Sequence, residues 1–510
     1  MDKKESTLWG ERVLKSFIDR TTMYRLMLYY LLILVTAAIF LSAIGVLPYD
    51  PTAILWSVVV LLTVSWLVNT SFARLYGAVT NVESVFITAL ILALIFQPVA
   101  YTDVAGFIML AIVAFLANAS KYVFAIQKKH VFNPAALAAV ISALLFGVPA
   151  TWWAAGNLAL LPFVLVGGLV IVYKLRRFDL VLAFSVSAIG TVALVSHSPV
   201  ASIQTTLLYS VFFFFAFIML TEPLTTPPTR ALRVVYGALV GILFITAPSI
   251  CPFYFSPELA LIAGNLFSYF VSPKVRYMLS LAERRPLAGG IYEYIFRSDR
   301  RLRFLPGQYL EWTLAQRQIR FGAGLGGVPL DARGNRRFFT IASAPEEETI
   351  ALGTRLPEEP SAFKRTLAEL PIGGVISASS LGGEFVMPKD TKRKLAFIAG
   401  GIGVTPFTSM ARHCIASGER RDAVLLYANK TASEVAYRDI FTDTERVGWR
   451  TAYRVGAIDA EYIKSEVPDY SKRLFYISGP PGMVDAMKRA LLTLGVSRFN
   501  IKTDFFPGLA

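Results

Sequence analysis

A run of glycines at the junction of an apolar segment and an expected helix is the first feature whose residue types suggest chemistry. The segment KLAFIAGGIGVTPF (394–407) places Gly400, Gly401 and Gly403 where a strand would give way to a helix. Glycine lets the backbone approach a pyrophosphate, and the free amides at a helix N-terminus bind anions. A tight turn between a strand and a helix also uses glycine, so this run alone is open to both interpretations.

A second segment, RRFFTIASAP (336–345), combines cations, aromatic rings and hydroxyl groups within a few residues. The Arg337 guanidinium is suited to phosphate, the Phe339 ring to stacking on another ring, and the Thr340 hydroxyl to hydrogen bonding. An amphipathic edge strand would explain the same pattern. The segment is therefore a candidate binding strand whose interpretation depends on its neighbours.

The surrounding sequence supplies elements that would position both segments. Alternating apolar and polar residues predict strands over 290–298 and 301–314. From residue 394 onward, strand-like and helix-like stretches alternate, and they cover 423–429, 433–441, 474–482 and 483–495. Strands that alternate with helices favour a parallel, nucleotide-binding sheet.

Six motifs in the second half occur together and in a fixed order. They are LPGQYL, RFFTIAS, LGGEF, GGIGVTP, SGPPGMV and TDFFPG. In their order and spacing they resemble the ferredoxin–NADP reductase superfamily, over about residues 290–510. The resemblance implies an antiparallel β-barrel FAD domain over 290–390 and an α/β Rossmann-like NAD(P) domain over 391–510. It also implies an FAD-dependent NAD(P)H oxidoreductase activity.

The resemblance assigns roles to individual residues. Arg337 would hold the FAD pyrophosphate, Phe339 would stack on the flavin ring, and Thr340 would hydrogen-bond near its N5 atom. The remaining FAD contacts that it implies are Ser343, Gly383 and Phe385, with Phe505 and Phe506 as covers of the ring. The nicotinamide nucleotide would contact Gly400, Gly401, Gly403, Thr405, Pro406, Gly479, Pro480 and Met483.

Departures from the pattern of that superfamily concern the reacting centre and the choice of coenzyme. Beside Thr340, the candidate catalytic residues are Ser478, where relatives commonly carry cysteine, and Asp504, where many carry glutamate near the flavin. After the second strand of the expected parallel sheet, Asn429 and Lys430 replace the Ser-Arg pair typical of strong 2′-phosphate binders. We therefore expect NADH to be slightly preferred over NADPH.

The composition of the whole chain points to a membrane protein in its first half. The 510 residues are 55% hydrophobic and only 17% charged, with a mean hydropathy of +0.54, whereas an ordinary soluble domain has about 25% charged residues. Ten apolar stretches that are candidate spans lie near 26–47, 53–71, 84–97, 104–119, 133–147, 158–173, 180–195, 206–220, 234–247 and 258–272. We expect a polytopic helical membrane domain over 26–273, after a polar segment (1–25) without a cleavable signal peptide and before a linker (274–289).

Basic residues in the loops predict how the membrane domain is oriented. With a cytoplasmic N-terminus, every Lys and Arg between the first and last span falls in an inner loop, and the five outer loops contain none. This is the positive-inside pattern. We therefore expect a multi-pass protein of the cell inner (plasma) membrane with both termini cytoplasmic. Because a basic domain is also favoured beside anionic lipid, the net charge of +15 does not make nucleic acid an expected partner.

The inventory of cysteine and histidine restricts the electron carriers. Cys251 and Cys414 are the only cysteines, and an iron–sulfur cluster needs about four ligands. Of the three histidines, His130 and His197 fall in predicted loops and His413 in the second half. We therefore expect no haem, no iron–sulfur cluster and no metal site, so that flavin or quinone would carry the electrons.

Three stretches at predicted cytoplasmic helix ends combine proline with polar residues. They are ESVFITALILAL (83–94), HVFNPAALA (130–138) and FIMLTEPLTTPP (217–228). Proline breaks a helix, and non-helical backbone at membrane depth is tolerated where it lines a cavity or a ligand site. Asn133, Thr221 and Thr225 are therefore candidate ligand contacts, although capping of helix ends explains the same residues equally well.

These stretches, together with PELALIAGNL (257–266), resemble the related FMN-carrying membrane components of the sodium-translocating NADH:quinone oxidoreductase and of the Rnf electron-transport complex. The resemblance covers roughly residues 25–275 and implies two five-helix halves of inverted topology, with a flavin in the membrane domain. Those proteins attach FMN to threonine in a short Ser/Asp-Gly-Ala-Thr stretch, which this sequence lacks. A non-covalent FMN or riboflavin is therefore the expected form.

Together the two halves predict a membrane oxidoreductase. Hydride from cytoplasmic NAD(P)H would reach FAD, and single electrons would pass through a membrane-domain flavin to an extracytoplasmic flavoprotein or a membrane acceptor. Besides NAD(P)H and the lipid bilayer, the acceptor is the expected partner. Two alternatives remain open: an NAD(P)H:quinone oxidoreductase without transmembrane transfer, and a redox-driven ion transporter that uses Glu83 and Glu222.

Overall fold

The computed structural model describes residues 21–76, 82–126, 129–245, 256–272, 275–314 and 336–504. The chain divides into an N-terminal unit, Met1–Val275, and a C-terminal unit, Arg276–Ala510. This division coincides with the change from apolar to mixed sequence.

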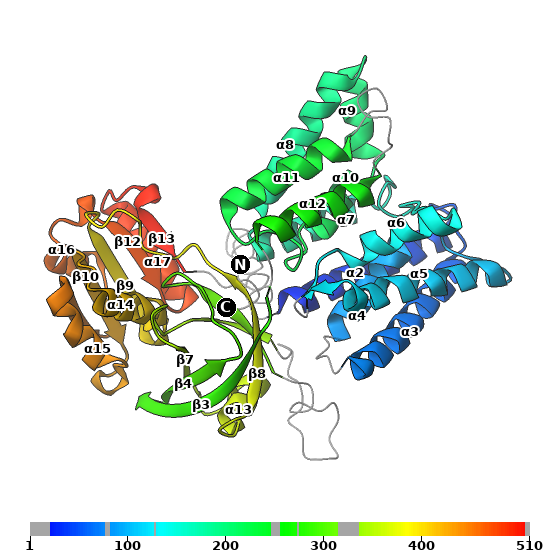
Figure 1. Cartoon of the computed structure of the whole chain (residues 1–510). Helices are drawn as coiled ribbons and strands as arrows, with labels where there is room; N and C mark the ends of the chain where they lie inside the picture. The colour runs from blue at the N-terminus through cyan, green and yellow to red at the C-terminus, as the bar shows by residue number, and fades with distance from the viewer. Residues whose placement is uncertain are drawn as a thin grey trace, which may run out of the picture. The chain divides into compact units, whose positions relative to one another are not determined.

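The N-terminal unit is helical (Figure 1). Its helices are α2 (Met23–Ala43), α3 (Pro51–Leu75), α4 (Val82–Ile95), α5 (Val104–Val123), α6 (Pro134–Phe146), α7 (Leu161–Leu175), α8 (Phe178–Val195), α9 (Pro199–Leu208), α10 (Phe212–Phe214), the π-helical turn η1 (Phe215–Met219), α11 (Arg230–Phe244) and α12 (Pro257–Val271). A two-stranded hairpin, β1 (Ala125–Ile126) and β2 (Lys129–His130), precedes α6.

Each of the ten apolar stretches overlaps a helix, but only some of these helices are long enough to cross a bilayer. In the part of the chain that is described, four qualify by length and hydropathy: α2, α3, α5 and α8. A fifth span results if Pro199–Leu208 and Phe212–Met219, bent by 62°, are taken together. Shorter helices such as α4, with 14 residues, reach only about 20 Å at about 1.5 Å per residue, against a hydrocarbon core of about 30 Å. Four or five apolar helices are consistent with membrane association, and ten spans stay a prediction.

The short helices begin where a side chain caps them. Asn133 accepts a hydrogen bond from the amide of Ala136, and Pro134 follows it as the first residue of α6. Ser256 caps α12 in the same way, ahead of Pro257. A polar cap followed by proline fixes the start of a helix, and this shortens the stretches that hydropathy alone extends into the loops.

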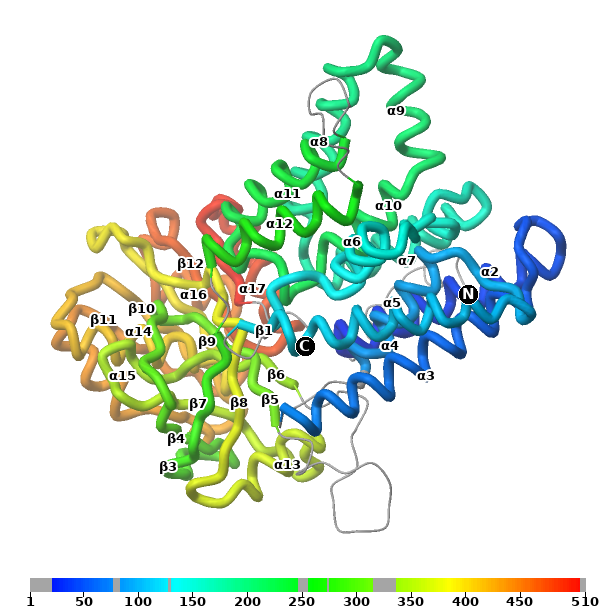
Figure 2. Tube along the Cα trace, turned by 45° about the vertical axis from the view of Figure 1, so that its right-hand side comes forward, coloured from blue at the N-terminus to red at the C-terminus, as the bar shows by residue number. Residues whose placement is uncertain are grey.

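Helix packing repeats in the two parts of the N-terminal unit. Helices α3 and α4 pack together and α5 packs on α6, while α8 packs on α11 and α11 on α12 (Figures 1 and 2). The two groups meet where α2 packs on α7 and α6 on α12. Two five-helix halves would produce this repetition, and their inverted topology remains a prediction.

Close packing of α11 on α8 depends on two glycines. A Cβ atom on Gly237 would lie 2.6 Å from the carbonyl oxygen of Leu180, and one on Gly241 would lie 2.5 Å from that of Phe184. Small residues four apart let helix backbones approach closely, which is a common arrangement in membrane helices.

The C-terminal unit begins with an antiparallel sheet in the order β6-β5-β8-β3-β4-β7. Its strands are β3 (Tyr277–Ala288), β4 (Ile291–Ser298), β5 (Tyr309–Thr313), β6 (Arg336–Thr340), β7 (Thr349–Arg355) and β8 (Val375–Gly382), and α13 (Ala362–Glu369) lies between β7 and β8. A bridge between Ile341 and Leu352 joins the two edges of the sheet, so the sheet closes as the predicted barrel does.

The linker expected over 274–289 is wrong for most of its length. Residues Tyr277–Ala288 form β3, which pairs with both β4 and β8. The cause is the alternation of Leu279 and Leu281, whose side chains are buried in the barrel core with Trp312. The barrel therefore begins at β3.

A five-stranded parallel sheet follows, in the order β11-β10-β9-β12-β13. Its strands are β9 (Leu395–Gly400), β10 (Ala423–Asn429), β11 (Trp449–Val455), β12 (Leu474–Ser478) and β13 (Ile501–Thr503); the helices are α14 (Thr405–Ser417), α15 (Arg438–Asp443), α16 (Ala460–Glu466) and α17 (Pro481–Thr493). Strand β9 lies between β10 and β12, so successive connections leave it in opposite directions. Ligands of such sheets bind at this switch point, beyond the carboxyl ends of the strands.

Candidate active site

Two turns meet at the switch point of the parallel sheet. Strand β9 ends at Gly400 and passes through a 3₁₀ turn, η3 (Gly401–Val404), into α14. Its neighbour β12 ends at Ser478, opposite Ala399 in the register, and passes into α17. Free amides at these helix starts lie beyond adjacent strands, which is the arrangement that a nucleotide pyrophosphate requires.

The glycines of these turns are needed for different reasons. A Cβ atom on Gly403 would lie 2.6 Å from both the Cα and the amide nitrogen of Gly479, so the two backbones nearly touch. Gly400 faces the Met483 thioether and the Pro480 ring. Gly401 has open space around it but a φ of +52°, which favours glycine. The structure thus brings the predicted residues of both turns together.

The two catalytic candidates of the C-terminal end also meet. The Ser478 hydroxyl donates a hydrogen bond to Oδ2 of Asp504 at 3.0 Å. The Asp504 amide donates to the carbonyl of Ile477, also at 3.0 Å, which extends the contact of β13 with β12. Phe505 and Phe506 lie outside the described residues.

The candidate flavin strand is β6. Arg337 is 5% exposed, and its guanidinium lies 5.4 Å from the centre of the Phe363 ring. The Phe339 ring lies 5.8 Å from the same ring. The Thr340 hydroxyl is buried and forms no hydrogen bond within the described part of the chain. A buried hydroxyl in this state fits a ligand atom that it would hydrogen-bond.

The remaining predicted flavin residues divide into two groups. Gly383, with a φ of +113°, lies beside the Tyr309 ring at the end of β8, where a close approach of backbone is expected. The Ser343 hydroxyl accepts a hydrogen bond from the Ala351 amide and so serves the fold.

Phe385 also lies in the protein core. Its ring packs against Phe407 and Tyr476, with ring centres at 5.6 and 5.1 Å, and the residue is 5% exposed. In this position the ring supports the parallel sheet, and only the backbone of Phe385 is left to a phosphate.

Helix α14 connects the nucleotide turn to the flavin strand. The Ser409 hydroxyl donates to the carbonyl of Ser343 at 2.7 Å, and Nη1 of Arg412 donates to that of Ala342 at 3.2 Å. The other side of the Arg412 guanidinium pairs with Glu293 of β4 at 3.1 Å. Sequence reasoning missed these contacts, although a buried Ser409 in an otherwise apolar helix face was a signal. They hold the start of α14 in register with the end of β6.

The polar residues predicted in the N-terminal unit gather around Glu222. Oε2 of Glu222 accepts hydrogen bonds from Nδ2 of Asn133 at 2.9 Å and from the Thr225 hydroxyl at 3.1 Å. Oε1 lies 3.6 Å from Nε2 of His130. Thr221 does not join this cluster, because its hydroxyl donates to the Phe217 carbonyl within the same turn.

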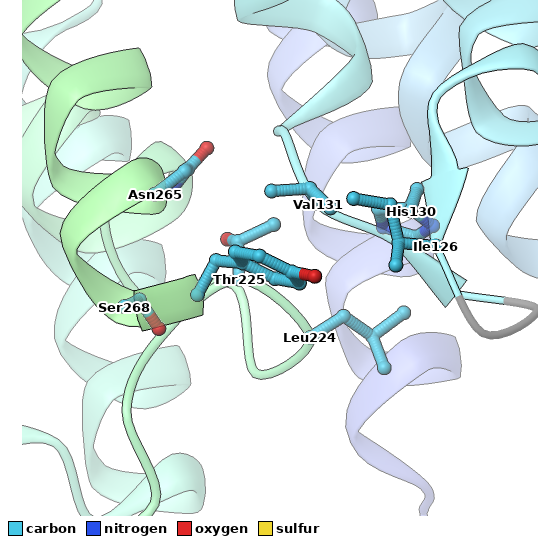
Figure 3. Close-up of a pocket in the computed structure, with 8 residues that line it drawn as sticks. Ile126, His130, Val131, Leu224, Thr225, Asn265 and Ser268 are labelled. Atoms are coloured by element: carbon cyan, nitrogen blue, oxygen red, sulfur yellow. The ribbon is translucent and has the colours of Figure 1, made fainter. Parts of the chain in front are cut away.

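A small cavity adjoins this cluster (Figure 3). It is lined by Ile126, His130, Val131, Leu224, Thr225, Asn265, Ser268 and Tyr269. Oδ1 of Asn265 accepts from the Asn133 amide at 2.8 Å, and its Nδ2 donates to the Tyr236 hydroxyl at 3.1 Å. Asn265 and Ser268 were missed, although their spacing puts them on one face of α12. Apolar walls with a few polar groups are typical of cofactor sites.

Metal-ligating side chains do not gather in either unit as far as the described ranges extend. No group of three or more His, Cys, Asp and Glu side chains within those ranges is arranged to hold a metal ion. The two polar clusters described above consist of hydrogen-bonding groups and ion pairs, with Glu222 at the centre of one and the Ser478–Asp504 pair in the other.

Comparisons with known proteins agree with the C-terminal geometry. Residues 397–489 match the family described as oxidoreductase NAD-binding domain. A flavohemoprotein of Oceanobacillus iheyensis is 25% identical over 220 residues, which are 40% of this chain and 52% of that protein. An NADPH oxidoreductase of Mycobacterium tuberculosis is 25% identical over 204 residues, 38% of this chain and 50% of that protein. The chain thus spans about half the length of these curated relatives.

A solved structure with a similar region is the cytochrome P450 reductase GcoB of Amycolatopsis. It is 20% identical, with a TM-score of 0.39, over 46% of this chain and 70% of that chain. Taken with the sequence matches, the C-terminal unit is an oxidoreductase domain of the ferredoxin-reductase type, which binds FAD and NAD(P)H.

Proposed function

We propose that this chain is a membrane-bound, FAD-dependent NAD(P)H oxidoreductase whose N-terminal unit receives electrons from the C-terminal unit through a second flavin. The observation that supports this most directly is the meeting of the two glycine turns with Ser478 and Asp504, tied by α14 to the end of the flavin strand. Nucleotide and flavin rings would need to be adjacent at this place for hydride to pass between them.

The residues of β6 fit an FAD. Arg337 would pair with the pyrophosphate after leaving the Phe363 ring, Phe339 offers an aromatic face, and the buried Thr340 hydroxyl has a hydrogen bond to give. FAD, when bound, accepts a hydride and releases electrons one at a time. The chain supplies the binding, the orientation and the exclusion of water.

On the nucleotide side, amides of the two turns would bind the pyrophosphate, and Ser478 would lie beside the nicotinamide. Asp504 holds the Ser478 hydroxyl at 3.0 Å and so fixes its direction. At the end of β10, Asn429 is buried and Lys430 is exposed, without the Ser-Arg pair that binds a 2′-phosphate strongly. On this basis we infer a preference for NADH, which a ratio of kcat/KM for NADH over NADPH greater than one would support.

In the N-terminal unit, we infer that the cavity beside Glu222 holds a non-covalent FMN or riboflavin. Apolar walls formed by Ile126, Val131 and Leu224 suit a flat ring, and Thr225 and Asn265 add polar edges. Electrons would pass from this site to an extracytoplasmic flavoprotein or a membrane acceptor. Electron transfer through the bilayer needs such a carrier, because about 30 Å of hydrocarbon insulates.

A quinone oxidoreductase that keeps its electrons on one side of the membrane is the second candidate. The same cavity favours it, since a flat ring with carbonyl groups would meet His130 on one side and Ser268 on another. A redox-driven ion transporter would require a rate that depends on sodium or a membrane potential during turnover.

Purified full-length protein, reconstituted into sealed vesicles with its reductase unit outside, tests these functions. We expect two flavins per chain, and NADH outside should reduce a membrane-impermeant acceptor inside. If FAD is the only flavin and added FMN or riboflavin restores nothing, the proposed second site is refuted. Reduction of a quinone in the membrane, with no transfer to the inside acceptor, would support the second candidate.

A further inference from the structure

The cavity beside Glu222 contains a buried polar atom that the fold does not use. Ser268 is 1% exposed, and its hydroxyl forms no hydrogen bond with any of the described residues. It lies on α12 one turn beyond Asn265, and both line the cavity with His130 (Figure 3). A buried hydroxyl without a partner is costly unless a ligand supplies one.

Glu222 is held in a fixed direction toward His130. Two neutral donors, Asn133 and Thr225, bind its Oε2 atom, which leaves Oε1 toward the His130 imidazole at 3.6 Å. A carboxylate held in this way orients an imidazole and stabilises its protonated form. Because His130 lines the cavity, the protonated ring would face whatever the cavity binds.

The other titratable and charged groups near this pair come from four elements. Lys121 of α5 interacts electrostatically with Glu222, while its ammonium group donates to the carbonyl of Ser84 and to Asn118. Tyr236 of α11 faces Glu222 across the Asn265 side chain.

On α4, Glu83 pairs with Arg25 of α2 at 3.1 Å and is thereby neutralised. On α12, Asn265 and Ser268 are neutral, and Tyr269 is the titratable group that lines the cavity. Among these groups in the described residues, the His130 imidazole is the one whose ordinary pKa lies near neutral pH.

We propose that His130 is the proton donor to the redox ring bound in this cavity, and that Glu222 is its positioning residue. This rests on the proposed function, in which a flavin occupies the cavity. Oxidation of NADH to NAD⁺ releases two electrons and one proton, and full reduction of a flavin consumes two electrons and two protons. The His130 N–H bond breaks as an N–H bond forms on the ring, and His130 regains a proton from water.

The test is the pH dependence of the midpoint potential of the second flavin, measured by spectroelectrochemistry on the full-length holoprotein. In the wild type, the slope of potential against pH changes where His130 titrates. His130→Gln abolishes this change of slope. Glu222→Gln moves it to lower pH, because loss of the carboxylate makes the imidazolium easier to deprotonate. His197→Gln, an exposed histidine elsewhere in the same unit, leaves the profile unchanged.

Stopped-flow reduction by NADH supplies a second readout. In His130→Gln, FAD is reduced at the wild-type rate, and reduction of the second flavin slows about 100-fold, as expected on loss of a general acid. If His130→Gln retains the flavin with an unchanged profile, or Glu222→Gln leaves the change of slope in place, the proton-donor role is overturned while the flavin site stands. If the wild type binds no second flavin, the proposed function falls as well.

Discussion

The contact between the two glycine turns makes Gly403→Ala the most informative substitution. The new methyl group would lie 2.6 Å from the Cα of Gly479 and 2.7 Å from the carbonyl carbon of Ser478. Carbon atoms in contact prefer about 3.5–4.0 Å, so the turns must separate by roughly 1 Å. The atoms in the way belong to the backbone, which is anchored by β12 and cannot rotate aside as a flexible side chain does.

The magnitude follows from the cost of overpacking. Forcing a methyl group into a packed site costs about 1–3 kcal/mol, and each 1.4 kcal/mol is a factor of ten. If the separation is borne by the nucleotide site, KM for NADH rises about 10- to 100-fold. A displacement of about 1 Å between reacting groups also lowers the rate of hydride transfer about 100-fold. The flavin content should not change, because Gly403 is outside β6.

The assay is steady-state NADH oxidation together with stopped-flow reduction of FAD. The matched control is Gly418→Ala at the C-cap of α14, where φ is +72° and nothing lies within 4 Å of a new Cβ. That substitution strains the backbone by about 1–2 kcal/mol, which lowers Tm but leaves KM for NADH unchanged. A KM for Gly403→Ala within twofold of the wild type, or an equal rise in the control, would refute the reasoning.

Three further predictions concern the C-terminal unit. Arg337→Ala lowers FAD occupancy about 10- to 100-fold through loss of a buried charge-assisted contact, seen in the absorbance of purified protein; normal FAD content would exclude the assigned role. Hydrogen bonds from Arg473 hold the pKa of Asp469 at about 2, below its unfolded value, so the stabilisation is present above pH 4 and lost as the pH falls toward 2. Asp469→Asn therefore costs about 1–2 kcal/mol at neutral pH and little at pH 2 in denaturant unfolding, and an equal cost at both would contradict this. Burial raises the pKa of Cys414 to about 12, so in a Cys251→Ser background the native protein resists thiol alkylation until it unfolds.

Much of the nucleotide site could be predicted from local sequence. Glycine spacing at 400–403, the strand before it and the helix after it depend on interactions between neighbouring residues, and the structure has all three. The meeting of Ser478 with Asp504 was less accessible, since it depends on β12 and β13 pairing in register. The sequence resemblance supplied that expectation, and composition did not.

Errors arose where a side chain had a choice of partners. Phe385 and Ser343 were expected at the flavin, but the ring is buried in the core and the hydroxyl binds a backbone amide. Thr221 likewise bonds its own helical turn. Each of these side chains satisfies the nearest partner that folding supplies, and sequence alone does not show which partner is nearest.

The sequence by itself determined the boundary between an apolar and a mixed half, the alternation of strands and helices, and the glycine turns, because these follow from periodicity and backbone conformation over a few residues. Only the tertiary structure decided that β3 belongs to the barrel, that the glycines of two distant turns touch, and that His130 lies against Glu222. Such contacts join residues far apart in the chain. They depend on strand pairing and helix packing, which are set by the burial of whole faces and by no single motif.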